Sequence, residues 1–168
     1  TSSLQLNFDH AMVGTPLVGD FNVSGLNGST APILSSVGTV NLRQGLSLNF
    51  GADLSAAIKV TYNGGLTDEG AGRAVLNRTW MIGTDGIDVL DASAQTTGLT
   101  LLGGAGSDLL KGGSGADVLV GGLGADTMSG GDGSDTFKYV NEIQGSGAAG
   151  GMGGKDGDVI TDFSFGRT

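Results

Sequence analysis

The sequence contains no cysteine, two prolines and one histidine, and aromatic residues make up only 5% of its 168 positions. Without cysteine, neither disulfide bonds nor thiolate metal sites can hold the chain. With 34 glycines and so few aromatic residues, one large side-chain core is not expected, so another interaction must help stabilise the fold. No apolar run approaches the roughly 18 residues of a membrane span, so membrane insertion is not expected.

The ends of the sequence show no targeting signal. The chain begins with Thr1 rather than Met, and it has no basic stretch followed by an apolar one, as a signal peptide would have. We therefore expect an excised or processed piece of a longer protein.

Charge is distributed unevenly along the chain. Residues 1–82 carry five acidic and four basic residues, whereas residues 83–168 carry twelve acidic and four basic residues and 23 of the 34 glycines. Eleven of those twelve acids are Asp, and a short carboxylate favours turns and metal ligation. The net charge of −8 in the second half argues against nucleic acid and anionic lipid as partners.

The second half contains a nine-residue repeat. Four consecutive units fit the pattern G-G-x-G-x-D-x-U-x, in which U is a large apolar residue: GGAGSDLLK, GGSGADVLV, GGLGADTMS and GGDGSDTFK, over residues 103–138. An earlier unit, GTDGIDVLD at 83–91, departs from it only at Thr84. The eleven residues between them, 92–102, are interpreted as a distorted sixth unit.

The composition of the repeat predicts a right-handed parallel β-roll. The glycine-rich first six positions permit a sharp turn, and the last three form a short strand of which only the middle side chain points inward. Two units make one coil, so parallel strands stack on two faces. The expected inward residues are Leu90, Leu110, Leu119, Met128 and Phe137. One apolar side chain per unit is too little to offset the entropy of ordering nine residues.

The sixth position of the repeat predicts metal binding. Its carboxylates, Asp88, Asp108, Asp117, Asp126 and Asp135, stack as like charges at the turns and repel one another without a cation. Carboxylates and turn carbonyls are hard oxygen ligands, which suit several Ca²⁺ ions rather than Zn²⁺. The glycines expected to line the sites are Gly104, Gly106, Gly113, Gly115, Gly122, Gly124, Gly131 and Gly133. Turns on one edge are two units apart, which predicts ions between Asp108 and Asp126 and between Asp117 and Asp135. Asp88 joins Asp108 if residues 92–102 complete a half-coil.

These units resemble the RTX (repeat-in-toxin) nonapeptides, and that resemblance implies a calcium-loaded β-roll in a bacterial protein exported by type I secretion. The segment GDVITDFSFG at 157–166 resembles the strand that closes such rolls. The resemblance implies that Asp158 and Asp162 are further calcium ligands, and that Ile160 and Phe163 cap the apolar row.

Residues 1–82 predict a β-sandwich, so the expected fold class is all-β with two domains, 1–82 and 83–168. Period-two alternation occurs in short runs at 4–8, 21–24, 39–42, 46–50, 58–62 and 74–80, separated by turn signals. The runs LQLNFDHAM, LSLNFGADL, IKVTYNG and LTDEGAGRAV resemble Ig-like repeats of the SwmB type, found in large bacterial surface proteins. A first strand of that family is missing here. Either the chain begins inside the domain, or a neighbouring copy or domain adds the strand.

Catalytic motifs are absent from the sequence. His10 lies beside Asp9, but neighbours in a strand point to opposite faces, and there is neither G-x-S-x-G nor a phosphate-binding loop. We therefore expect a non-catalytic adhesion segment of a secreted cell-surface protein that folds on calcium outside the cell. The alternatives are the carrier module of a secreted lipase, protease or epimerase, and a self-assembling surface-layer or filament subunit.

Overall fold

The computed structural model describes residues 2–7, 12–13, 17–30, 32–40, 45–50, 54–63, 67–68, 79–138 and 157–162. It divides the chain into two compact units, Thr1–Thr79 and Trp80–Thr168, close to the expected boundary after Ile82. The regular elements of the described residues are strands and one short 3-10 helix, as the expectation of an all-β chain requires. None of the described helices is long and apolar enough to span a membrane.

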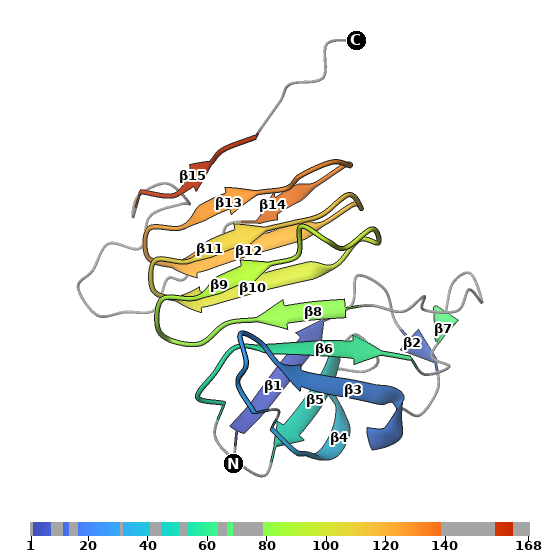
Figure 1. The fold of residues 1–168 in the computed structure, drawn as a ribbon. Helices are drawn as coiled ribbons and strands as arrows, with labels where there is room; N and C mark the ends of the chain where they lie inside the picture. The colour runs from blue at the N-terminus through green and yellow to red at the C-terminus, as the bar shows by residue number, and fades with distance from the viewer. Residues whose placement is uncertain are drawn as a thin grey trace. The chain divides into compact units, whose positions relative to one another are not determined.

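The first unit is built from antiparallel strands (Figure 1). Its elements are β1 (Ser2–Asn7), β2 (Met12–Val13), η1 (Val18–Asp20), β3 (Phe21–Gly25), β4 (Leu34–Val40), β5 (Gly45–Phe50), β6 (Ile58–Tyr62) and β7 (Thr67–Asp68). β5 pairs with β1 and β4 in a three-stranded sheet, β3 pairs with β6, and β2 pairs with β7. The expected run at 39–42 belongs to a strand that begins earlier, at Leu34. The Ig-like assignment of this unit stays a prediction.

The apolar core of the first unit follows the period-two pattern. In β6 the alternation places Ile58, Val60 and Tyr62 inside, and the ring of Tyr62 lies 4.9 Å from that of Phe21 in β3. Leu48 and Phe50 of β5 are fully buried. Other apolar positions of the alternating runs, such as Leu4, Leu46 and Val75, have side chains outside the described part of the chain, and Val23 of the run 21–24 is half-buried.

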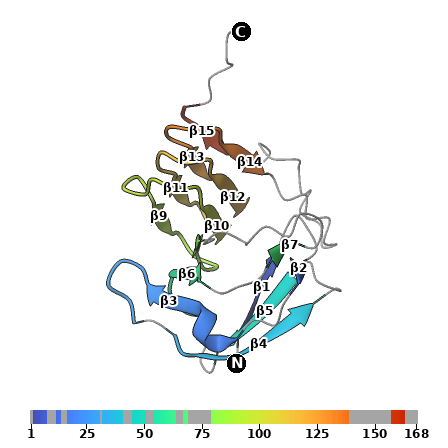
Figure 2. The ribbon, with the colours of Figure 1, turned by 90° about the vertical axis from the view of Figure 1, so that its right-hand side faces the viewer.

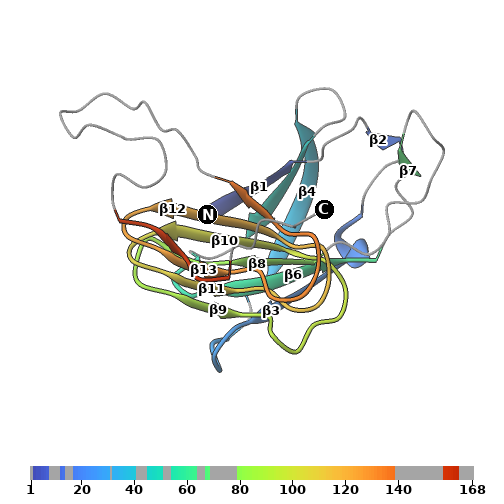
Figure 3. The same cartoon turned by 90° about the horizontal axis from the view of Figure 1, so that it is seen from above.

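The second unit is a parallel β-roll, as predicted (Figures 1 and 2). Its strands are β8 (Thr79–Ile82), β9 (Val89–Asp91), β10 (Thr100–Ala105), β11 (Leu109–Lys111), β12 (Val118–Leu123), β13 (Thr127–Ser129), β14 (Thr136–Lys138) and β15 (Val159–Ile160). One face carries β8, β10, β12 and β14 in that order, and the other carries β9, β11, β13 and β15, with every pair parallel. Seen from above, successive coils superpose (Figure 3).

A single row of apolar side chains fills the roll. Leu90, Leu110, Leu119 and Met128 have no exposed surface, and the distorted unit contributes Leu101 in register with Leu119, so residues 92–102 do complete a half-coil. The expected inward residue Phe137 is only half-buried, because β14 is the last described strand of its face.

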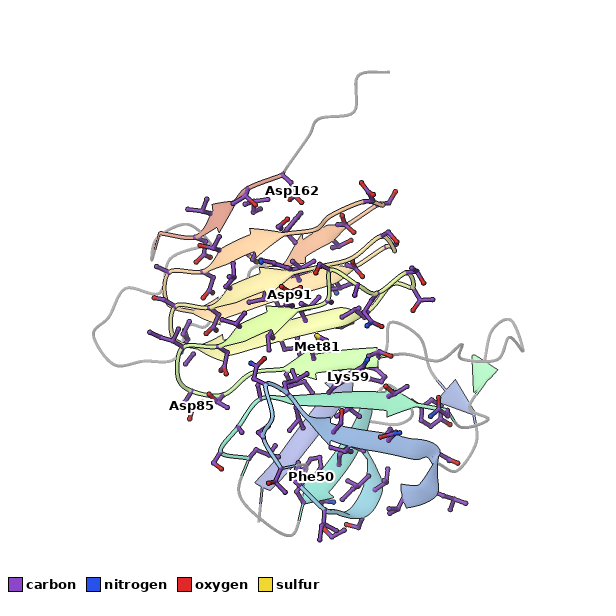
Figure 4. All side chains as sticks on the ribbon, in the orientation of Figure 1. Phe50, Lys59, Met81, Asp85, Asp91 and Asp162 are labelled. Atoms are coloured by element: carbon purple, nitrogen blue, oxygen red, sulfur yellow. The ribbon has the colours of Figure 1, made fainter. Side chains whose placement is uncertain are left out.

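One strand at the expected domain boundary pairs with the roll. Residues 74–80 are expected to end the sandwich; the strand found here is Thr79–Ile82, and its Trp80, Met81 and Ile82 pair in parallel register with Thr100, Leu101 and Leu102 of β10. The buried Met81 starts the apolar row of that face (Figure 4). The roll therefore begins before the first repeat unit.

Candidate metal sites in the turns of the roll

The position-six carboxylates form a hydrogen-bonded row along one edge of the roll. The backbone amide of Asp88 donates to Oδ1 of Asp108, that of Asp108 to Oδ1 of Asp126, and that of Asp126 to Oδ1 of Asp158, each at 2.9 Å. The predicted neighbours Asp108 and Asp126 are thus adjacent, and Asp88 joins them. Asp158, from outside the repeat, continues the row in the closing segment.

The other edge carries a shorter row. The amide of Asp117 donates to Oδ1 of Asp135 at 3.0 Å, so this predicted pair is also adjacent. One coil earlier, the distorted unit has Leu99 where a regular unit has Asp, and the Leu99 amide donates to Oδ1 of Asp117 at 2.9 Å. The two edges of the roll therefore differ in the number of carboxylates they bring together.

Three of these carboxylates are buried. Asp108, Asp117 and Asp126 are no more than 2% exposed, and they are the only buried charged or polar residues among those described. Burial, together with the neighbouring carboxylates of Asp126 and Asp88, raises the pKa of Asp108 to about 6, although the hydrogen bond from the Asp88 amide opposes this shift. A buried carboxylate is costly unless a positive charge or hydrogen bonds compensate it.

Oδ2 of Asp108 has no such compensation from the described residues. This oxygen is buried, and none of those residues donates a hydrogen bond to it. It lies over the first glycine of its own turn, where a Cβ built on Gly103 would come within 2.5 Å of it. A buried acceptor without a donor calls for an explanation, and a bound cation supplies one.

Backbone carbonyls lie at the contact between turns 103–108 and 121–126, and that of Gly121 faces the same glycine, Gly103, as Asp108 Oδ2 does. Three carbonyl oxygens point at a glycine in the facing turn: that of Gly104 at Gly122, that of Gly106 at Gly124, and that of Gly121 at Gly103. A Cβ at any of these glycines would collide with the facing oxygen. The repeat needs glycine there because the two turns approach each other through their carbonyls.

The donor set fits calcium. Among the described residues, no three His, Cys, Asp or Glu side chains converge on one point, so an ion in these turns would be held by one or two carboxylates together with carbonyls. All of these ligands are hard oxygens, which Ca²⁺ binds in flexible arrangements of six to eight. The residues that would hold an ion here are Asp108, Asp126 and the carbonyls of the facing glycines.

Asp162, expected as a further ligand, lies at the last turn and accepts hydrogen bonds (Figure 4). Its carboxylate accepts from the amides of Gly130 at 3.1 Å and Gly131 at 2.8 Å, and from Oγ of Ser129 at 2.7 Å. Partial burial raises the pKa of Asp162, but these hydrogen bonds outweigh it, so the pKa lies below its ordinary value. Ile160 lies in register with Met128, and Phe163 lies outside the described residues.

Thr84 is a residue of the site that sequence reasoning passed over. Its amide donates to Oδ2 of Asp88 at 2.6 Å and its hydroxyl donates to the same oxygen at 2.8 Å. The available signal was its place, the one departure from the repeat pattern in the unit 83–91. Thr84 stands where the regular units have glycine, so it has a side-chain hydroxyl that can donate to the carboxylate.

The comparison with known families agrees with this geometry. Residues 102–137 match the RTX calcium-binding nonapeptide repeat in four copies, which covers the four regular units. No curated protein sequence is detectably similar to this chain. The second unit therefore carries RTX calcium-binding repeats on a β-roll, and these repeats imply that it binds Ca²⁺.

Proposed function

We propose that this chain is a non-catalytic, calcium-dependent structural segment of a secreted bacterial adhesin, and that its roll folds when it meets calcium outside the cell. The observation that carries the proposal is the buried Oδ2 of Asp108, which has no hydrogen-bond partner among the described residues and lies where the Gly121 carbonyl also faces Gly103. Calcium bound there compensates the buried charge and joins two coils.

Calcium availability then acts as the folding switch. Because the ion binds the folded turns and not the extended chain, its binding free energy adds to the stability of the fold. Extracellular modules of this kind bind calcium with dissociation constants of about 10⁻⁴ to 10⁻³ M. The roll thus stays unfolded where calcium is scarce and folds where it reaches millimolar levels, which suits export of an extended chain by type I secretion.

The first unit supplies the surface for attachment in this proposal. β1 and β4 are the outer strands of the described three-stranded sheet, and an outer strand offers unpaired backbone groups. Strand addition by a neighbouring copy or domain would use them. Light scattering of the chain with calcium tests this part, and a monomer at high concentration would contradict it.

Calcium titration of the full chain tests the proposal directly. Trp80, the single tryptophan, is 4% exposed in β8 of the roll, so its fluorescence reports folding there. We expect a blue shift and a gain of β signal in circular dichroism as calcium rises, and no change with the same concentration of Mg²⁺. Identical spectra in excess chelator and in calcium would contradict calcium-dependent folding.

The absence of catalysis has its own test. A screen for esterase, protease and glycosidase activity on the calcium-loaded chain should show no turnover. Turnover that disappears on Asp108→Ala with calcium-dependent folding intact would overturn the structural assignment.

A further inference from the structure

The turns of the roll adopt two different conformations. In turns 103–108, 121–126 and 130–135 the second and fourth residues are glycines with left-handed φ, between +89° and +134°. In turns 83–88 and 112–117 neither of these positions is left-handed. We call the first kind open turns and the second kind closed turns.

Closed turns satisfy their own carboxylate. In turn 112–117 the amide of Gly113, the second residue, donates to Oδ2 of Asp117 at 2.8 Å. In turn 83–88 the corresponding amide of Thr84 donates to Oδ2 of Asp88, and the Thr84 hydroxyl adds a second hydrogen bond to the same oxygen. The hydroxyl also accepts from the Gly86 amide at 3.1 Å, which ties the turn together. Both lone pairs of this Asp88 oxygen are therefore used.

The open turn 103–108 leaves one oxygen of its carboxylate unsatisfied. Gly104 has φ +110°, no hydrogen bond joins its amide to the carboxylate, and Oδ2 of Asp108 has no partner among the described residues. The facing turn 121–126 is open as well, with Gly122 at φ +113° and Gly124 at φ +114°. Within the described residues, this is the one pair of regular repeat turns stacked on the same edge in which both are open.

We infer that the tightest calcium site of the roll lies between turns 103–108 and 121–126, and that Thr84 closes turn 83–88 in place of an ion on Asp88 Oδ2. The inference rests on the calcium-dependent folding proposed above, and it predicts that the sites differ in calcium affinity. An ion bound to Asp108 Oδ2 displaces no hydrogen bond from that oxygen, whereas an ion bound to Asp88 Oδ2 must displace two.

The first experiment counts the ions bound by three variants of the full chain. Native mass spectrometry and calorimetric titration are compared for Asp108→Asn, Asp88→Asn and the control Asp91→Asn, whose carboxylate lies on the outer face, 3.4 Å from Nζ of Lys111. We expect Asp108→Asn to bind one ion fewer and to need at least about tenfold more calcium to fold. Asp88→Asn and Asp91→Asn should keep the ion count of the unchanged protein. Loss of an ion in Asp88→Asn would overturn the inference.

A second experiment does not depend on variants that fold. In crystals of the unchanged chain grown at limiting calcium, we expect the highest ion occupancy between turns 103–108 and 121–126, with Thr84 still donating to Asp88. Equal occupancy in all turns, or an ion bound to Asp88 Oδ2, would overturn the inference while leaving calcium-dependent folding intact. A chain that binds no calcium at millimolar concentration would instead contradict the proposed function itself.

Discussion

The two units of this chain solve the same problem, holding short strands together, by different means. The first unit buries large side chains, among them Phe21, Phe50 and Tyr62, and needs no charge in its described core. In the roll, each strand from β9 to β13 buries one apolar side chain, and three carboxylates are buried beside them. Packing alone can stabilise the first, whereas the second carries buried carboxylates that no described basic residue neutralises. The comparison shows that a fold built from a short repeated motif has little side-chain packing and relies on ion binding for the rest of its stability.

Removal of calcium should produce the largest difference in stability between the two units. With excess chelator, we expect residues 80–168 to become sensitive to protease while residues 1–79 stay resistant, because only the roll depends on the ion. Limited proteolysis followed by mass spectrometry identifies the surviving fragment. Equal loss of protection in both units would show that the first unit depends on the folded roll.

Truncation of a core side chain in the first unit should lower the stability of that unit whether or not calcium is present. Phe50 has no exposed surface, so Phe50→Ala should lower the free energy of unfolding of the first unit by about 3–5 kcal/mol in calcium and in chelator alike. Chemical denaturation under both conditions measures this effect. The control Ile33→Ala, at a side chain that is 79% exposed, should change stability by no more than about 0.5 kcal/mol.

A methyl group introduced into one of the facing turns should weaken the folding of the roll and leave the first unit unchanged. Gly122 has φ +113°, and a Cβ there would collide with the carbonyl oxygen of Gly104. The left-handed conformation alone costs a side chain about 1–2 kcal/mol, and the collision adds to it, so Gly122→Ala should shift calcium-induced folding to higher calcium. Gly19→Ala serves as the control because nothing lies within 4 Å of the added methyl. An unchanged calcium midpoint for Gly122→Ala would contradict the stacking of these turns.

A lower pH should weaken calcium binding, with a smaller effect than the changes above. The pKa of Asp108 in the folded, calcium-free roll is about 6, above its ordinary value of 3.8, mainly because of burial. The calcium-free fold therefore gains stability as the pH falls through about 6 and has the full gain below about 4. Protons thus compete with calcium, and the midpoint of the calcium titration should be higher at pH 5 than at pH 7.5. Asp108→Asn should reduce this dependence, and an identical pH dependence in the variant would contradict the role of Asp108.

Much of the roll was predictable because its pattern is local and in phase. The spacing of Asp108, Asp117, Asp126 and Asp135 placed them correctly in adjacent pairs, and the inward positions Leu90, Leu110, Leu119 and Met128 are buried as expected. Strand alternation predicts the side of each residue, and a constant repeat length predicts which residues meet one coil later. The pairing of the strand Thr79–Ile82 with β10 was not predicted, because the residues of a short strand do not show which strands it will pair with.

The sequence by itself determined the coil, the inward row and the stacked carboxylates, since each follows from residues within one or two units. Only the tertiary structure decided which turns are open. Turn 112–117 has the same pattern of glycines and Asp as the open turns, yet it is closed. Its neighbour one coil earlier is the irregular unit 92–102. There the backbone carbonyl of Gln95 accepts a hydrogen bond from the amide of Ser114, and Leu99 stands at the position that is Asp in a regular unit. The repeat pattern shows which turns are stacked, but the conformation of a stacked turn depends on the backbone of the turn it contacts, and that backbone is known only from the tertiary structure.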